Sequence, residues 1–249
     1  KNLHSLTPKF LLRYAPGHMR KAGTEGNKLN YGNLFNLNKL NQVDILEPGL
    51  STSVGFEYKK NKLNDNNIIG KEMLTFSMGQ VISQKENMDI PSSSSLDQRF
   101  SDIVGTGTYR INAKSNLNYN FSIDQGYKNF NYNEIGADFG LNKAKFNINY
   151  LQEKNHVGNQ EYLKTGFEVG LSKSSEVTFN TKRNLLTSSA EFYNLSYNYI
   201  NDCLKAGIAY RREFYTDRDI EPVDKLMFTI SIVPFSTINT PGIKWKNLF

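Results

Sequence analysis

Apolar and polar residues alternate with a period of two along most of this sequence. Residues 116–124, NLNYNFSID, show the pattern clearly, with apolar residues at Leu117, Tyr119, Phe121 and Ile123. Successive side chains of a strand point to opposite faces, so the segment predicts a strand with one apolar and one polar face. Helical periodicity is hard to find, and the alternation therefore predicts an all-β fold.

The same alternation recurs in eleven further segments, which makes about twelve predicted strands. They are 8–14, 50–60, 71–84, 103–114, 133–142, 144–150, 163–171, 175–184, 188–200, 203–214 and 225–235. Most approach the length of about 9 to 11 residues that a tilted strand needs to cross a membrane. Strands of soluble proteins average only about 5 to 6 residues.

The connections between these segments alternate in length. Long polar connections cover 15–49, 85–102, 125–132, 153–159 and 215–224, and short turns lie around 114–116, 142–143, 172–175 and 200–203. Consecutive connections of an up-and-down barrel fall on opposite rims, and outer-membrane barrels have short periplasmic turns and longer outer loops. The pattern predicts an antiparallel up-and-down transmembrane β-barrel. Two connections fit less well, because 61–70 is long for the rim of the short turns and 185–187 is short for the rim of the long loops.

Composition leaves one alternative open. No stretch approaches the roughly 18 consecutive apolar residues of a membrane helix, which excludes a helical membrane protein but not a barrel. The hydrophobic fraction of 38% is low for a large buried core, while 14 Tyr and 16 Phe are available for an apolar face. A soluble array of paired sheets would show the same alternation and stays an alternative.

The sequence carries no recognisable catalytic, cofactor or metal motif, so we expect no enzyme, no cofactor and no metal. His4, His18 and His156 are isolated and are interpreted as solvated residues, and Ser92–Ser95 lacks a nucleophile elbow and is interpreted as a flexible loop tip. The net charge of +6 comes from lysines spread along the chain, and the aromatic residues alternate with Asn and Ser. Nucleic-acid binding is therefore not expected.

Cys203 is the only cysteine of the chain and precedes a predicted strand. Counting strands places it on the rim of the short turns, which is the periplasmic and oxidising side of an outer-membrane barrel. A single cysteine forms no internal disulfide, so any covalent role of Cys203 needs a partner outside this chain.

Several stretches resemble the LptD family of outer-membrane lipopolysaccharide assembly proteins, in its C-terminal barrel region. They are TPKFLLRYAPG (7–17), LEPGLSTSVGFEYKK (46–60), MGQVIS (78–83), PSSSSLDQRFSDIVG (91–105) and NYINDCLKAGIAYRREFYTDRDIEP (198–222). The last stretch is the most specific, whereas residues 106–190 would match many outer-membrane proteins.

The resemblance implies that residues 1–249 are the C-terminal part of a barrel in the cell outer membrane, a partial barrel of about twelve strands. The family's N-terminal periplasmic domain and first barrel strands are expected to be absent from this chain. The implied function is insertion of lipopolysaccharide into the outer leaflet through the lumen and a lateral gate. The implied partners are lipopolysaccharide, an LptE-like plug lipoprotein, a periplasmic bridge protein of the same system and membrane lipid. An autonomous twelve-strand barrel, either a porin-like channel or a hydrolase, is the alternative.

The resemblance also suggests roles for individual residues. Cys203 matches family cysteines that form disulfides with the N-terminal domain, although the commonest family pattern has two adjacent cysteines and this chain has one. The strand at 225–235 would be the last of the barrel, and its Pro234 donates no ladder hydrogen bond, which would weaken the lateral gate or simply end the strand. Lys205 and Arg211 share the lumen side with Glu168 and Glu213, and either contact phosphates of the glycolipid or belong to a mixed polar lining.

Overall fold

The computed structural model describes residues 1–18, 21–22, 28–40, 45–63, 69–214, 223–232, 236–239 and 243–244. The chain divides into two compact units. Unit 1 comprises Lys1–Ile135 with Leu151–Gln160, and unit 2 comprises Gly136–Tyr150 with Glu161–Phe249. Among the described residues, no helix has the length and apolarity needed to cross a membrane.

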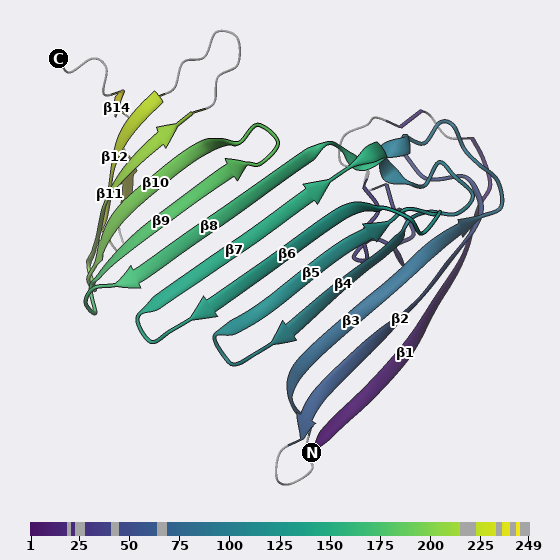
Figure 1. Ribbon diagram of the computed structural model, residues 1–249, viewed down its shortest axis with the longest axis horizontal. Helices are drawn as coiled ribbons and strands as arrows, with labels where there is room; N and C mark the ends of the chain where they lie inside the picture. Colours follow the sequence, from purple (N-terminus) through teal and green to yellow (C-terminus); the bar gives the residue numbers. More distant parts are fainter. Residues whose placement is uncertain are drawn as a thin grey trace. The chain divides into compact units, whose positions relative to one another are not determined.

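Antiparallel strands make up the described structure, and from β1 to β13 each pairs with its neighbours in sequence, whereas β14 pairs with β12 (Figure 1). In the first part of the chain they are β1 (Asn2–Ala15), β2 (Gly49–Leu63), β3 (Ile69–Ser83), β4 (Ile103–Arg110), β5 (Ser115–Ile123), β6 (Phe130–Gly140) and β7 (Ala144–Glu153). They continue with β8 (Gln160–Gly170), β9 (Ser175–Asn184), β10 (Ser189–Ile200), β11 (Leu204–Glu213), β12 (Val223–Ile232), β13 (Ser236–Asn239) and β14 (Ile243–Lys244). Two short 3₁₀ turns, η1 (Ser92–Ser94) and η2 (Asn155–Val157), lie in connections.

The predicted all-β fold and its twelve strands are confirmed, because each predicted segment overlaps one of β1 to β12 in order. The alternation of connection length is also present, with short turns at 111–114, 141–143, 171–174 and 201–203. The expectation that the strand at 225–235 is the last one is wrong. β12 ends at Ile232, and the short strands β13 and β14 both pair with it.

In both units the strand register separates an apolar face from a polar face. In unit 1, β1 exposes Leu6, Phe10, Leu12 and Tyr14, each by 60% or more of its surface. In unit 2, Leu195 lies opposite Phe179 and Tyr210, and Ile208 lies opposite Tyr197 and Phe228. Outward apolar bands of this kind are typical of membrane-spanning barrels.

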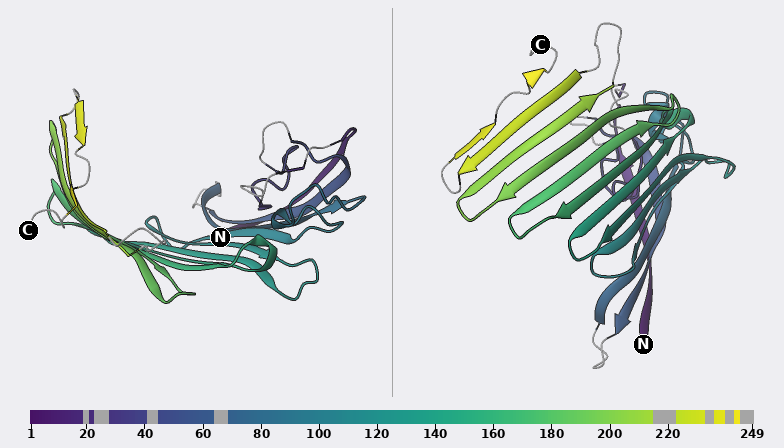
Figure 2. Two further views of the ribbon diagram at one scale, coloured as in Figure 1. Left: turned by 90° about the horizontal axis from the view of Figure 1, so that it is seen from above. Right: turned by 60° about the vertical axis from the view of Figure 1, so that its left-hand side comes forward.

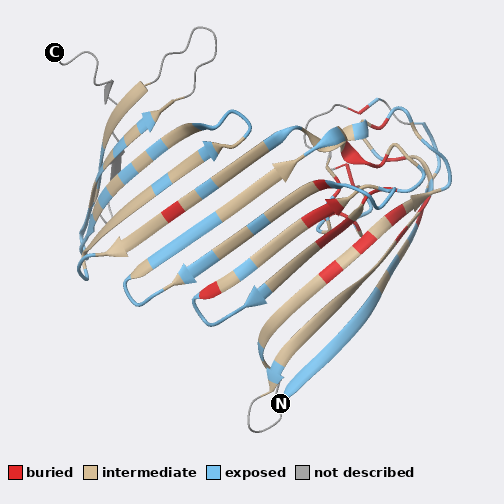
Figure 3. Ribbon diagram, viewed as in Figure 1, coloured by how far each residue is buried: buried red, intermediate tan, exposed pale blue. Residues whose placement is uncertain are grey.

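A buried core exists in unit 1, where loops fold against the polar face (Figure 2). We call residues 21–22, 28–40, 45–48 and 84–102 the loop layer. Loop-layer residues Ala22, Leu29, Leu34, Leu40, Ile90 and Leu96 pack into one cluster with Val81 of β3 and Val104 of β4. Figure 3 shows the buried positions gathered on this end of β2 to β5 and in the loops. The loop layer gives unit 1 an interior that its single sheet layer alone would lack.

Two glycines allow the loop layer to dock against the sheet. Gly55 of β2 lies directly opposite Gly79 of β3. A Cβ atom at Gly79 would lie 2.6 Å from Leu34 Cδ2, and one at Gly55 would lie 3.1 Å from Phe35 Cζ. Side chains at these two positions would occupy the space of Leu34 and Phe35. The absence of side chains at the two glycines therefore allows the loop to pack closely against the sheet.

Candidate functional site

The polar face of unit 1 carries a chain of neutral and acidic side chains across β4, β5 and β6. Thr106 Oγ1 donates to Asn120 Oδ1 at 2.7 Å, and Asn120 Nδ2 donates to Glu134 Oε2 at 2.9 Å. The Tyr132 hydroxyl donates to the same carboxylate oxygen at 2.8 Å. A cavity of about 450 Å³ lies over these four residues, with Lys28 and Tyr31 of the loop layer also among those that line it.

Lys28 reaches from the loop layer to the end of β7. Its Nζ lies 2.6 Å from Glu153 Oε1 and 3.0 Å from the centroid of the Tyr132 ring. Burial lowers the pKa of Lys28, and the hydrogen bond to Glu153 opposes that shift. The ion pair and the aromatic contact therefore hold the loop over the cavity at a site from which water is partly excluded.

The polar face of unit 2 carries a row of amide side chains, which we call the amide row: Asn147 of β7, Asn180 of β9 and Asn194 of β10. Gly166 of β8 lies opposite Asn180, which lies opposite Asn194. A Cβ atom at Gly166 would meet the amide groups of both Asn147 and Asn180, so the glycine gives these side chains room to extend over β8. The row presents hydrogen-bond donors and acceptors without net charge.

Charged side chains on the same face are mostly paired with each other. Arg211 lies opposite Asn194, and its Nε lies 2.7 Å from Glu213 Oε1. Its guanidinium carbon also lies 4.5 Å from the centroid of the Phe192 ring. Lys225 pairs with Glu213 at 2.9 Å. The predicted placement of Arg211 and Glu213 on one face is therefore confirmed, and their pairing leaves Arg211 partly neutralised.

Lys205 and Glu168 occupy the polar face near the short turns. Lys205 is exposed at the start of β11, opposite Ile200 and Ser231. Glu168 accepts a hydrogen bond of 2.6 Å from Lys145. Cys203 is an exposed free thiol in the turn that precedes β11, and Pro234 lies outside the described residues. The structure does not bring Cys203, Lys205 and Arg211 together into one site, because they are spread along one strand and its turn.

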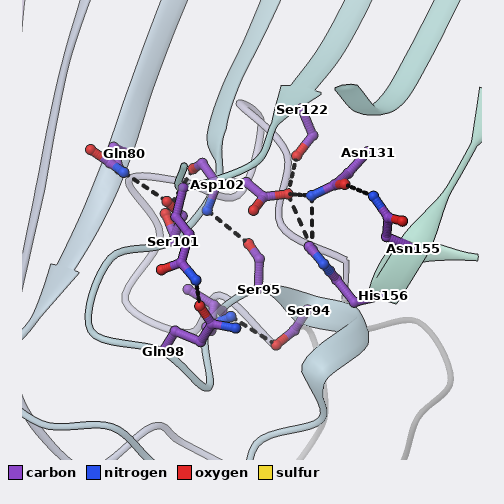
Figure 4. Close-up of polar contacts among 12 residues, drawn as sticks. Gln80, Ser94, Ser95, Gln98, Ser101, Asp102, Ser122, Asn131, Asn155 and His156 are labelled. Carbon is purple, nitrogen blue, oxygen red and sulfur yellow. Dashed lines mark hydrogen bonds and ion pairs between the residues drawn. The ribbon is translucent and has the colours of Figure 1, made fainter. Parts of the chain in front are cut away.

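A buried polar network joins two connections of unit 1 to the sheet (Figure 4). Asp102 Oδ2 accepts hydrogen bonds from Ser122 Oγ at 2.6 Å and Asn131 Nδ2 at 2.9 Å, and His156 Nε2 lies 3.2 Å away.

The interpretation of His156 as a solvated residue is wrong, since its side chain is 22% exposed. The hydrogen bond to Asp102 raises the pKa of His156, and burial opposes the shift. Sequence reasoning missed Asp102, because nothing in its local pattern distinguishes it from a solvated loop aspartate.

The interpretation of Ser92–Ser95 as a flexible tip is also wrong. Ser92–Ser94 form η1, and Ser94 and Ser95 are buried. Ser94 Oγ donates to the Pro91 carbonyl at 2.7 Å, and Ser95 Oγ accepts a hydrogen bond from the Asp102 amide at 3.2 Å. These serines hold the loop in shape by satisfying buried backbone groups.

The geometry of this network does not resemble a catalytic triad. Ser122 and His156 both contact the same oxygen of Asp102, so the histidine does not face the serine hydroxyl as a base. Within the described ranges, no group of three His, Cys, Asp or Glu side chains is arranged to hold a metal ion. The arrangement is suited to positioning loops against the sheet.

Comparison with known proteins identifies one matching family. Residues 1–199 match the family model described as LPS transport system D, LptD. A comparison with curated protein sequences finds no match.

Solved structures with loose similarity include porins of Rhodopseudomonas blastica. A triple mutant of that porin is 12% identical, with 97% of this chain and 99% of that chain covered and a TM-score of 0.37. Another mutant of the same porin has the same identity and coverage and a TM-score of 0.38. The structure titled "Asymmetric conductivity of engineered proteins" covers 95% of this chain and 97% of its own, with 12% identity and a TM-score of 0.37.

Proposed function

This chain belongs to the LPS transport system D (LptD) family, and on that premise we propose that it inserts lipopolysaccharide into the outer leaflet through the barrel lumen and a lateral gate. The chain is an outer-membrane β-barrel protein of lipopolysaccharide transport. Family membership also favours transport without covalent chemistry.

The observation that carries the proposal is the amide row of unit 2. Asn147 and Asn180 meet over Gly166, and Asn194 extends the row on the same polar face. Saccharide hydroxyls need many donors and acceptors, and neutral amides supply both without the tight binding of a charged pair. A polar face of this kind suits the passage of the sugar part of a glycolipid, while the apolar face meets membrane lipid.

The proposed phosphate contacts are Lys205 and Arg211. Lys205 is exposed and lies near the short-turn rim, where a glycolipid delivered from the periplasm would arrive. Arg211 shares its charge with Glu213. We therefore assign the larger share of phosphate attraction to Lys205.

The proposed lateral gate involves the strand edges of the barrel. In the described part of the chain, β1 pairs with β2 alone, so its other edge is available to a partner strand. The proposed role of Pro234, which lies outside the described residues, is to weaken the strand pairing at the C-terminal end of the chain by withholding one ladder hydrogen bond. Pro234→Val should then tighten this pairing and lower lipopolysaccharide export, and unchanged export would argue for a plain strand end.

The remaining proposals concern the assembly. An LptE-like plug lipoprotein and a periplasmic bridge protein are the proposed partners, and residues 1–249 are proposed to form the C-terminal part of the barrel domain. Cys203 is proposed to form a disulfide with an N-terminal periplasmic domain, for which its exposed position in the turn before β11 leaves it accessible.

The amide row provides the test of the proposed function. Asn147→Leu with Asn180→Leu removes the hydrogen-bonding groups over Gly166 and should lower the amount of lipopolysaccharide at the cell surface. The matched control, Asn147→Ser with Asn180→Ser, keeps polar groups and should retain most export. Heat-modifiable migration in electrophoresis reports whether each barrel has assembled. An assembled Leu variant with normal surface lipopolysaccharide would argue against the proposed route.

A further inference from the structure

Two short turns of unit 2 carry nearly the same residues in the same order. Residues 140–143, between β6 and β7, are Gly-Leu-Asn-Lys, and residues 170–173, between β8 and β9, are Gly-Leu-Ser-Lys. The Gly170 amide donates to the Lys143 carbonyl at 2.7 Å, so the backbones of the two turns are in direct contact. The rim of the short turns therefore presents two adjacent copies of one arrangement, a leucine followed two residues later by a lysine (Figure 1).

The leucines of both turns extend the apolar face of the sheet. Leu141 follows Phe139, and Leu171 follows Val169, each with the spacing of two that keeps side chains on one face. The Leu171 amide donates to the Ser175 carbonyl at 2.9 Å, which continues the β8–β9 ladder one residue beyond the end of β8. Leu141 and Leu171 are 64% and 58% exposed. In a barrel surrounded by lipid, these leucines lie where the apolar band ends.

The lysines of the two turns carry charge that the protein does not neutralise. Lys143 and Lys173 are exposed, and neither turn contains an acidic residue. Neither lysine forms an ion pair with another residue that the structure describes. Lys145, two residues beyond Lys143, differs from both, because its Nζ lies 2.6 Å from Glu168 Oε1 on the polar face. A lysine beside the end of an apolar band extends its ammonium group to the level of the lipid headgroups.

The position of the turns and their charge restrict what binds there. Short turns of outer-membrane barrels lie on the periplasmic side, so the leaflet at this height is the periplasmic one. A lipid contacts the leucine through its acyl chains and the lysine through its phosphate, whereas a protein partner would have to displace lipid from the leucine. Two lysines without a carboxylate attract an anionic headgroup and repel the ammonium group of a zwitterionic one.

We propose that the turns 141–143 and 171–173 bind anionic phospholipid of the periplasmic leaflet, with phosphatidylglycerol as the probe. Lys143 and Lys173 contact the lipid phosphate, and Leu141 and Leu171 contact the acyl chains next to it. The contact between the two turn backbones holds both pairs at one depth, so the bound lipid fixes this rim at the membrane surface. The leucines lie on the apolar face, and the site is therefore independent of the route that lipopolysaccharide takes.

Native mass spectrometry of the purified full-length protein, titrated with phosphatidylglycerol, tests the proposal. Lys143→Gln and Lys173→Gln should each raise the dissociation constant of the first bound phosphatidylglycerol about fivefold, as expected for a lysine near an anionic lipid surface. Lys143→Arg and Lys173→Arg keep the charge and should keep the affinity. Lys145→Gln is the matched control, because Lys145 is exposed on the same strand but faces Glu168, and it should leave the dissociation constant unchanged. Phosphatidylcholine should bind the wild type and the Gln variants equally.

A second measurement uses the wild type alone. Phosphatidylglycerol with a photoreactive headgroup, in bilayer nanodiscs with the full-length protein, should crosslink within 141–143 and 171–173. Equal affinity of the wild type and both Gln variants, together with no crosslink in these turns, would overturn the proposal. An equal loss of affinity in Lys145→Gln would identify a general effect of surface charge and would also overturn it. Unchanged lipid binding with weaker co-purification of a periplasmic bridge protein would assign the two lysines to a protein partner instead.

Discussion

His156 Nε2 lies 3.2 Å from Asp102 Oδ2. This contact joins the turn after β7 to the residue just before β4, although the two residues are 54 positions apart in sequence. Asp102 is buried and also binds Ser122 and Asn131. The contact therefore connects the loop layer to η2 and to the sheet at one point. Asp97 and Asp124 also act electrostatically on His156, and both favour its charged form.

The pH dependence of this contact follows from the raised pKa of His156. Its stabilisation is fully present below the ordinary value of 6.5 and is lost as pH rises through the raised value in the folded protein. Hydrogen exchange in 154–159, corrected for intrinsic rates, should therefore accelerate as the pH rises from 6.5 through the raised pKa of His156. His156→Gln should remove this dependence, whereas His4→Gln, at an exposed histidine bonded to Tyr58, should retain it. A pH-independent wild type would contradict the assignment.

Leu34 should be the main apolar anchor of the loop layer. It is 0% exposed, whereas Leu37 in the same loop is 68% exposed. Leu34→Ala leaves a cavity and should lower the free energy of loop-layer opening by about 2 to 5 kcal/mol. Leu37→Ala, the matched control, should change it by about 0.5 kcal/mol or less. Native-state hydrogen exchange of residues 28–40 measures both, and similar losses in the two variants would refute the packing shown here.

Gly79 should tolerate no side chain while the loop layer is docked. A Cβ atom there would lie 2.6 Å from Leu34 Cδ2 and 2.5 Å from the Val54 carbonyl oxygen. Gly79→Ala should therefore cost about 1 to 3 kcal/mol and displace the loop. Limited proteolysis within 84–102 should become faster.

Gly107 is the control for this substitution. A Cβ atom at Gly107 would have its nearest contact at 3.5 Å, to Phe76, which is an ordinary distance. Gly107→Ala should leave the rate of proteolysis in 84–102 close to that of the wild type. If Gly79→Ala also leaves the rate of proteolysis in 84–102 unchanged, the absence of a side chain at Gly79 is not needed for docking of the loop layer.

Cys203 should form a disulfide with a partner outside these 249 residues. Its thiol is exposed in the turn before β11 and has no second cysteine in this chain. Full-length protein from isolated outer membranes should migrate differently in reducing and non-reducing electrophoresis, and Cys203→Ser should abolish the difference. Identical migration of the wild type under both conditions would leave Cys203 as a free thiol.

Local alternation was enough to predict the strands and their faces. A period of two reports local geometry, so the pattern alone assigned Leu204, Ile208 and Tyr210 to one face and Lys205 and Arg211 to the other. Alternating loop lengths likewise predicted the up-and-down order. The strand at 225–235 was misjudged as the last because the segments that follow it, β13 and β14, have only 4 and 2 residues. Such short segments carry too little alternation to be recognised.

The conformation of the long loops, by contrast, depends on contacts between residues that are distant in sequence. Leu34 meets Gly79 and His156 meets Asp102 across large separations in sequence, and no local pattern encodes either contact. The same is true of Lys39, which looks like any loop lysine in the sequence and is fully buried in the fold. Loop conformation depends on which buried groups find partners after the strands have formed the sheet, and that is a property of the assembled chain.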